Sequence, residues 1–203
     1  MAYPTISSPY GLKPINLIGG QSYAGSTRLM QIKSGVTNAI FFGDLVQRDT
    51  DGTIIRVTPG ATLPATGVVG VFVGCSYVNA QGQQLYAQYC PAGLTVTSGT
   101  IQGYVVDDPD ALFKVAVVSS GTTVTGVQYT AIGENGTLVD NGGSTTTGDS
   151  ATAMSATTAT TASLPVRIVD VVPDTAYVSG GNTLYPEVIV KINLHQYNNT
   201  TGV

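Results

Sequence analysis

Residues 44–57 read DLVQRDTDGTIIRV, and this stretch decides the fold class. Two short runs containing Val and Ile, residues 45–48 and 53–57, flank the dipeptide Asp51-Gly52. An Asp-Gly pair between two such runs is the strongest short-range signal for a β-hairpin, because a tight hairpin turn needs residues that accept a positive φ. The sequence therefore predicts a hairpin with its turn at Asp51-Gly52.

The same kind of pattern recurs on both sides of this hairpin. A second hairpin is predicted from residues 68–78 and 84–90, with a turn around Gln81-Gly82. Residues 101–106 and 113–118 are expected to form the next pair of strands, joined through a short acidic turn. Further strands are predicted at residues 28–33, 166–172 and 188–194.

Helix is expected to be scarce. No stretch has an apolar period of 3.6 residues over three turns, so at most a short helical turn is predicted, near Pro109–Leu112. Short strands separated by turn signals are typical of a sandwich or a barrel. The sequence thus predicts an all-β protein, an antiparallel β-sandwich or barrel, with one β domain over residues 26–203.

Residues 1–25 differ from the rest of the chain and are expected to form an extended N-terminal arm. Pro and Gly recur there, although a flexible linker would lack the large apolar side chains that this segment also carries. The arm would lie in a groove of a partner; the alternative is that it packs back on its own domain as an irregular edge. The side chains that would anchor such an arm are Tyr3, Tyr10, Leu12, Ile15 and Leu17.

Residues 142–163 are rich in Thr, Ala, Ser and Gly, with Asp149 as their one charge. Two interpretations compete: a long surface loop, or weak strands with small side chains packed closely against a neighbour. Thr favours an extended backbone, whereas Ala supplies little packing area. We favour a long loop with strand-like pieces.

Composition narrows the function. The 203 residues include 12 acidic and 8 basic side chains and one histidine, and the charged fraction of 10% compares with roughly 25% in an ordinary globular domain. Active sites need clustered titratable groups, so we expect neither an enzyme nor a cofactor. A net charge of −4 argues against nucleic-acid binding, which needs a basic surface. No apolar run approaches the length of a membrane span and no targeting segment is recognised, so synthesis in a reducing cytoplasm is expected.

Two groups of residues are candidates for a metal site or a catalytic role. Asp107, Asp108 and Asp110 could offer oxygens to Ca²⁺, but the Gly and the distal Glu of an EF-hand loop are missing, and a tight turn stabilised by Asp side chains explains the same pattern. We therefore expect no metal there. His195 follows an apolar strand and has no recognisable nucleophile motif to serve, so a structural hydrogen-bonding role is predicted.

Cys75 and Cys90 fall on the two strands of the second predicted hairpin. A turn centred on Gly82-Gln83 would place them directly opposite each other, whereas one centred on Gln81-Gly82 would offset them diagonally. For a protein made in a reducing compartment, two buried thiols are predicted rather than a disulfide.

Three short motifs also carry a resemblance: residues 8–14 (SPYGLKP), 70–78 (GVFVGCSYV) and 104–109 (YVVDDP). Together they resemble small structural proteins of tailed bacteriophages, particularly marine ones, and are similar to capsid decoration, or cement, proteins. Such proteins sit on an icosahedral head that is built from a different major capsid protein. The resemblance implies an all-β protein on the outer capsid surface of the virion, with no catalytic residues to carry over.

On this resemblance the expected partner is the major capsid protein, and residues 1–25 would reach across capsid subunits. A homo-oligomer is expected, with a trimer favoured. The alternative is a receptor-binding fibre or spike head, which would more often have sequence repeats and an exposed aromatic sugar-binding patch. A polysaccharide-cleaving enzyme would need paired carboxylates about 5–10 Å apart, and few acids lie outside Asp107–Asp110 to supply them.

Overall fold

The Asp51-Gly52 turn reverses the chain as the sequence predicts. In the computed structural model, which describes residues 6–96, 98–175 and 185–198, Gly52 has a φ of 82° and the flanking strands pair antiparallel. The described strands are β1 (Lys13–Leu17), β2 (Arg28–Ile32), β3 (Leu45–Arg48), β4 (Ile54–Arg56), β5 (Gly70–Val78), β6 (Gln84–Ala87), β7 (Ile101–Val106), β8 (Ala111–Val118), β9 (Asn135–Val139), β10 (Ala153–Ala159), β11 (Val166–Val171) and β12 (Glu187–Ile192).

A first barrel closes from strands in the order β3-β4-β2-β7-β5, because β3 also pairs with β5. Strand β6 is added outside this ring, on β5. Alternate side chains fill the interior: on β2, Met30 and Ile32 are buried, whereas Leu29 and Gln31 face outward. This is the period of two that strands impose on their side chains.

A second barrel closes in the order β8-β10-β9-β11-β12, with β8 also pairing with β12 and β1 added outside on β8. Its interior includes the fully buried side chains of Phe113, Met154, Ile168 and Val190. The pairs β2–β4 and β8–β10 are parallel, and the other pairs are antiparallel. The prediction of an all-β sandwich or barrel is confirmed, although the sequence did not divide the strands between two barrels.

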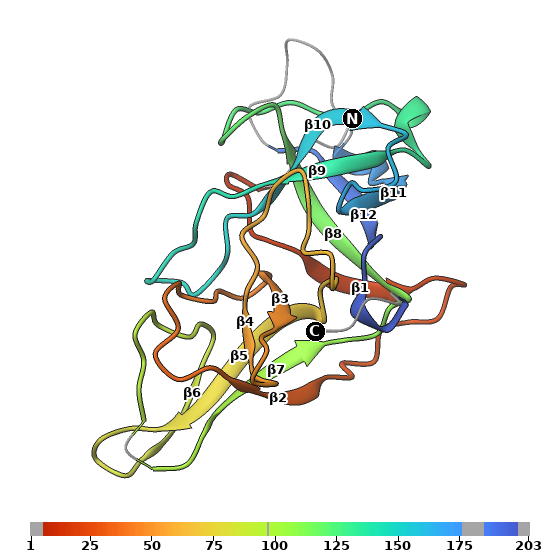
Figure 1. Cartoon of the computed structure of the whole chain (residues 1–203). Helices are drawn as coiled ribbons and strands as arrows, with labels where there is room; N and C mark the ends of the chain where they lie inside the picture. Colours follow the sequence, from red (N-terminus) through yellow and green to blue (C-terminus); the bar gives the residue numbers. More distant parts are fainter. Residues whose placement is uncertain (1–5, 97, 176–184, 199–203) are drawn as a thin grey trace.

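The chain visits the second barrel first, with β1, then builds the first barrel from β2 to β7, and returns with β8 to β12 (Figure 1). Strands β7 and β8 follow each other in sequence but lie in different barrels. The predicted pairing of residues 101–106 with 113–118 is therefore wrong. Strand β7 pairs with β2 in the first barrel, and β8 pairs with β12 in the second, although both partners are distant in sequence. Residues 107–110 therefore connect the two barrels.

The N-terminal segment packs on its own chain, which corrects the expectation of a free arm for residues 9–17. Tyr10 and Leu12 are 7% and 0% exposed within the core, so they cannot anchor the chain to a partner. Ile15 and Leu17 lie half-buried on the edge strand β1. Tyr3, the remaining predicted anchor, lies outside the described residues.

Part of the Thr/Ala-rich segment is a barrel strand. Residues 153–159 form β10, which lies between β8 and β9, and Ala153 and Met154 are fully buried. A Cβ on Gly136 of β9 would lie 3.1 Å from the Met154 sulfur, so these two strands pack closely. The preference for a long loop is wrong for this part, and the alternative of strands with small side chains is correct.

The described residues contain little helix, as predicted: three single 3-10 turns, at Tyr129–Ala131, Pro173–Thr175 and Gln196–Asn198. The sequence allowed at most a short helical turn near Pro109–Leu112, and none forms there, because β8 begins at Ala111. In the part of the chain that the structure describes, no helix has the length and hydropathy of a membrane span.

Two glycines allow the N-terminal segment to pass between the barrels. Gly11 and Gly43 have φ values of 79° and 91°, and a Cβ on Gly43 would lie 3.0 Å from the Gly11 Cα. The Leu12 N–H donates to the Gly43 carbonyl at 3.0 Å, and the Gly11 N–H donates to the Thr152 carbonyl at 3.1 Å. Gly43 precedes β3 and Thr152 precedes β10, so this backbone contact ties both barrels together.

We expect Gly43→Ala to lower the free energy of unfolding by about 2 kcal/mol more than Gly133→Ala does, because overpacking typically costs about 1–3 kcal/mol. Gly133 is a matched control, since it has the same φ of 91° but open space where its Cβ would be. Both variants share the cost of a left-handed non-glycine residue, about 1–2 kcal/mol. Urea unfolding measures the difference, and equal losses would show that the contact relaxes without cost.

Candidate functional site

The carboxylates of the acidic turn between the barrels, Asp107, Asp108 and Asp110, each bind a different partner. Asp107 pairs with Arg28 Nε at 2.7 Å, and Asp110 pairs with Lys191 Nζ at 2.7 Å. The Asp108 carboxylate accepts the Asp110 N–H at 2.8 Å, which stabilises the turn. Among the described residues no group of three potential metal ligands comes together. The arrangement matches the predicted tight turn: Asp108 stabilises the turn itself, whereas Asp107 and Asp110 pair with cations from other strands.

His195 is buried beside the first barrel and hydrogen-bonds to the backbone. Its Nδ1 accepts the Tyr197 N–H at 3.2 Å, and residue 195 bridges to Val68. Burial lowers the pKa of His195, which favours the neutral imidazole. These contacts fit the structural role predicted for this residue.

The two cysteines are free and buried, but neither predicted register is correct. Cys75 lies opposite Ala87, and Cys90 lies beyond the end of β6, where it bridges to Ile40. The Cys75 thiol donates to the Tyr89 carbonyl at 3.5 Å, next to Cys90 in sequence. A hydrogen bond between the thiols lowers the pKa of Cys75 and, with burial, raises the pKa of Cys90.

A buried ionic network joins the two barrels. Arg56, at the end of β4, bonds Asp44 through Nε at 2.7 Å and Asp140 through Nη2 at 2.8 Å and Nη1 at 3.1 Å. Asp44 precedes β3 in the first barrel, and Asp140 follows β9 in the second. Asp44 is fully buried and also accepts the Phe41 N–H at 2.9 Å and the Ser150 hydroxyl at 2.7 Å.

The protonation behaviour of this network follows from burial and pairing. Burial raises the pKa of Asp44, against the charge and hydrogen bonds of Arg56. Burial also acts to raise the pKa of Asp140, but hydrogen bonds from Arg56 and from the Gly142 N–H outweigh it, so that the pKa is lowered. A guanidinium does not release a proton in proteins, so Arg56 stays charged opposite both carboxylates. The network therefore links the two barrels through ion pairs.

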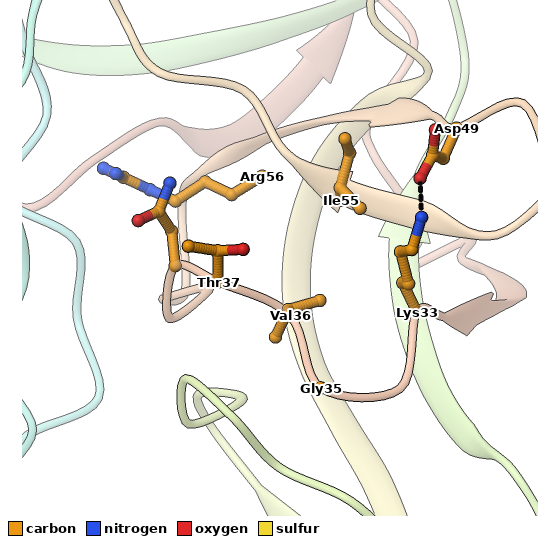
Figure 2. A pocket seen from close by; sticks show the side chains of 8 residues that line it. Lys33, Gly35, Val36, Thr37, Asp49, Ile55 and Arg56 are labelled. Carbon is orange, nitrogen blue, oxygen red and sulfur yellow. Dashed lines mark hydrogen bonds and ion pairs between the residues drawn. The ribbon is translucent and has the colours of Figure 1, made fainter.

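A pocket of about 250 Å³ lies beside the network (Figure 2). Figure 2 shows Lys33 paired with Asp49 at one end and Arg56 at the other. The lining residues are Lys33, Gly35, Val36, Thr37, Asn38, Asp49, Ile55 and Arg56. Both cations are already paired with carboxylates, so within this lining no nucleophile lies next to a free base, as covalent or acid–base catalysis would require.

The clearest candidate surface for interaction is the β5–β6 hairpin. Residues 57–106, which include it, contain no charged side chain. On β6, Tyr86 is 75% exposed and Leu85 is 37% exposed. Other large apolar side chains of the described residues are also exposed, as is normal on protein surfaces: Ile18, Leu29, Tyr129, Ile132 and Tyr197.

Comparisons of the chain with protein-family models, with curated proteins and with solved structures found no match. Sequence reasoning missed both the ionic network and the uncharged hairpin. The hairpin had a readable signal in the absence of charge from 57 to 106, but Asp140 lies 84 residues from Arg56 and nothing local connects them.

Cys75 and Cys90 should react with a thiol reagent only after unfolding, because buried thiols are inert. Titration with Ellman's reagent, in native buffer and in guanidinium chloride, measures this directly. A reductant should leave the thermal unfolding midpoint unchanged, since both thiols are free. A midpoint that falls on reduction would show that the two sulfurs are joined in the stable protein.

Arg56→Met should destabilise the protein by about 3–5 kcal/mol, because it leaves Asp44 buried without its cation. The control is Arg167→Met, an exposed arginine on β11, for which a loss below about 1 kcal/mol is expected. Adding Asp44→Asn to Arg56→Met should recover part of the loss, since the buried group is then neutral. Equal losses at Arg56 and Arg167 in urea unfolding would mean that the network contributes nothing special.

Proposed function

We propose that this chain is a structural protein of a tailed bacteriophage, which binds the outer surface of the icosahedral head and stabilises the lattice of the major capsid protein. The observation that carries the proposal is the set of three motifs, 8–14, 70–78 and 104–109, that resembles decoration proteins. The ion pairs of the chain also support the proposal. Many of its carboxylates pair with its own cations, which suits a structural protein better than an enzyme.

The three motifs lie where the two barrels are built and joined. Residues 8–14 run through the contact between the barrels, residues 70–78 are β5, and residues 104–109 lead from β7 into the connection. The resemblance therefore concerns residues that determine the architecture. Because Tyr10 and Leu12 are buried in the chain's own core, capsid binding would use the outer surface of the barrels.

The physical mechanism is mass action. A protein that binds the assembled shell, but not its dissociated subunits, shifts the assembly equilibrium toward the shell. Many copies bound to a repeating lattice add their effects, so each contact can be weak. Two closed barrels tied by buried contacts suit this task, because a rigid binder loses little conformational entropy on docking.

A receptor-binding fibre or spike head is the second candidate. The observation that favours it is the exposure of Tyr86 and Leu85 on an uncharged hairpin, since aromatic side chains with a polar end are frequent in recognition surfaces. The two functions place the protein at different positions on the particle, so imaging distinguishes them.

Purified chain added to phage heads that lack it should appear by cryo-EM as density on the outer head surface. The decorated heads should also survive heating to a higher temperature than bare heads, because bound protein stabilises only the assembled shell. Heads of an unrelated phage serve as the control and should stay bare. Density at the tail or fibres, with bare heads, would contradict decoration and support the fibre alternative.

A further inference from the structure

Strand β6 offers one hydrogen-bonding edge to a neighbour. It pairs with β5 without a register shift, and the Asn79 N–H donates to the Gln83 carbonyl at 3.0 Å at the start of the hairpin. Hydrogen-bonded pairs alternate along an antiparallel ladder, so Leu85 and Ala87 direct their backbone groups toward β5. The N–H and C=O groups of Gln84 and Tyr86 consequently point away from β5.

Apart from its short length, this edge has none of the usual protections. Natural edge strands are commonly shielded by charged side chains, by proline or by a bulge. The sequence of β6 is QLYA, within a segment that is uncharged from residue 57 to 106, and the pairing with β5 is regular. Successive side chains alternate between faces, so the exposed Leu85 and Tyr86 present apolar surface on both sides of the strand.

Other strands in the described residues are protected. The two rings are closed, which removes their edges. Strand β1, the other added strand, carries Lys13, and residues 18–22 fold against its outer edge: the Leu17 N–H donates to the Gln21 carbonyl at 2.8 Å, and Asn16 bridges to Ser22. Among the described residues, β6 is therefore the strand with an unprotected edge. If the β6 edge pairs with a strand of a second copy, the strand available for pairing is β6 of that copy.

We propose that β6 pairs antiparallel with β6 of a second copy, so that Gln84 of each copy lies opposite Tyr86 of the other. This register uses the outward backbone groups of both residues and brings the two Leu85 side chains together on one face. Like-to-like pairing of this kind generates a two-fold axis. The two paired strands carry no charge, and Asp149, which accepts the Gln88 side-chain amide at 2.8 Å, is bonded beyond the end of β6. Like charges therefore do not oppose each other within the paired strands of two copies, each of net charge −4.

The pairing is two-fold and therefore predicts a dimer, in contrast to the trimer expected from the resemblance. The strand is four residues long, so the dimer should be weak and concentration-dependent. The dimer should form in the purified chain alone, whether or not the chain binds a phage head.

Sedimentation of the full chain over micromolar to millimolar concentrations tests the pairing. Wild type should show a monomer–dimer equilibrium, and Tyr86→Lys should raise the dimer dissociation constant by about tenfold or more, because it places charge at the contact. Tyr129→Lys, at a tyrosine that is 55% exposed on the second barrel, is the matched control and should behave as wild type. A wild type that stays monomeric, or a trimer that Tyr86→Lys does not affect, would overturn the proposal.

Two further variants test the register itself. Gln84→Pro removes an outward N–H without removing a bond to β5, so it should keep the fold, as checked by circular dichroism, and abolish the dimer. Leu85→Cys should form a disulfide-linked dimer on mild oxidation by dissolved oxygen, which takes two electrons and two protons from the paired thiols. Tyr129→Cys should not, and equal cross-linking of the two cysteine variants would refute this register.

Discussion

The pairing of Arg56 with Asp44 and Asp140 is the interaction on which the arrangement of the two barrels depends. Asp44 and Arg56 belong to the first barrel and Asp140 to the second, and Asp44 is completely removed from water. A buried charge is tolerated only when its partners are all in place, so the network is satisfied in one relative position of the barrels. In that position the Ser150 hydroxyl, which precedes β10, completes the shell around Asp44.

Apolar and backbone contacts around the network extend the same constraint. One core cluster combines Leu45 and Val106 of the first barrel with Phe113 and Val190 of the second. The N-terminal segment is held in this junction by Leu12, which is part of the same cluster and donates its N–H to the Gly43 carbonyl. Beside it, the buried Tyr10 hydroxyl donates to Glu187 of the second barrel, and burial raises the pKa of Tyr10. Residues that first looked like a tether to another protein are thus a structural part of the fold.

The distribution of charge in this architecture affects how the protein can bind other molecules. Asp44 is fully buried, Arg56 is largely buried and Asp140 is partly exposed, and the long segment from β5 to β7 carries no charge. Contacts made through such a surface depend on close packing and hydrogen bonds rather than on long-range attraction, and salt screens them little. A protein of this kind can add many weak contacts over a repetitive surface, where avidity makes up for the weakness of each one.

The sequence by itself determined the elements whose cause is local. The Asp51-Gly52 hairpin and the strands near residues 28–32, 166–171 and 187–192 were readable because turn chemistry and alternation act between neighbours in the chain. The partners of these strands were not readable: β7 and β8 separate into different barrels, β10 inserts between β8 and β9, and β1 joins a barrel built from the far end of the chain. Alternation states which side chains of a strand are buried, but not which other strand buries them. The pairing of strands is decided in the tertiary structure, by burial and by contacts such as that of Arg56 with Asp140. Such contacts stabilise the protein only after segments that are distant in sequence have come together.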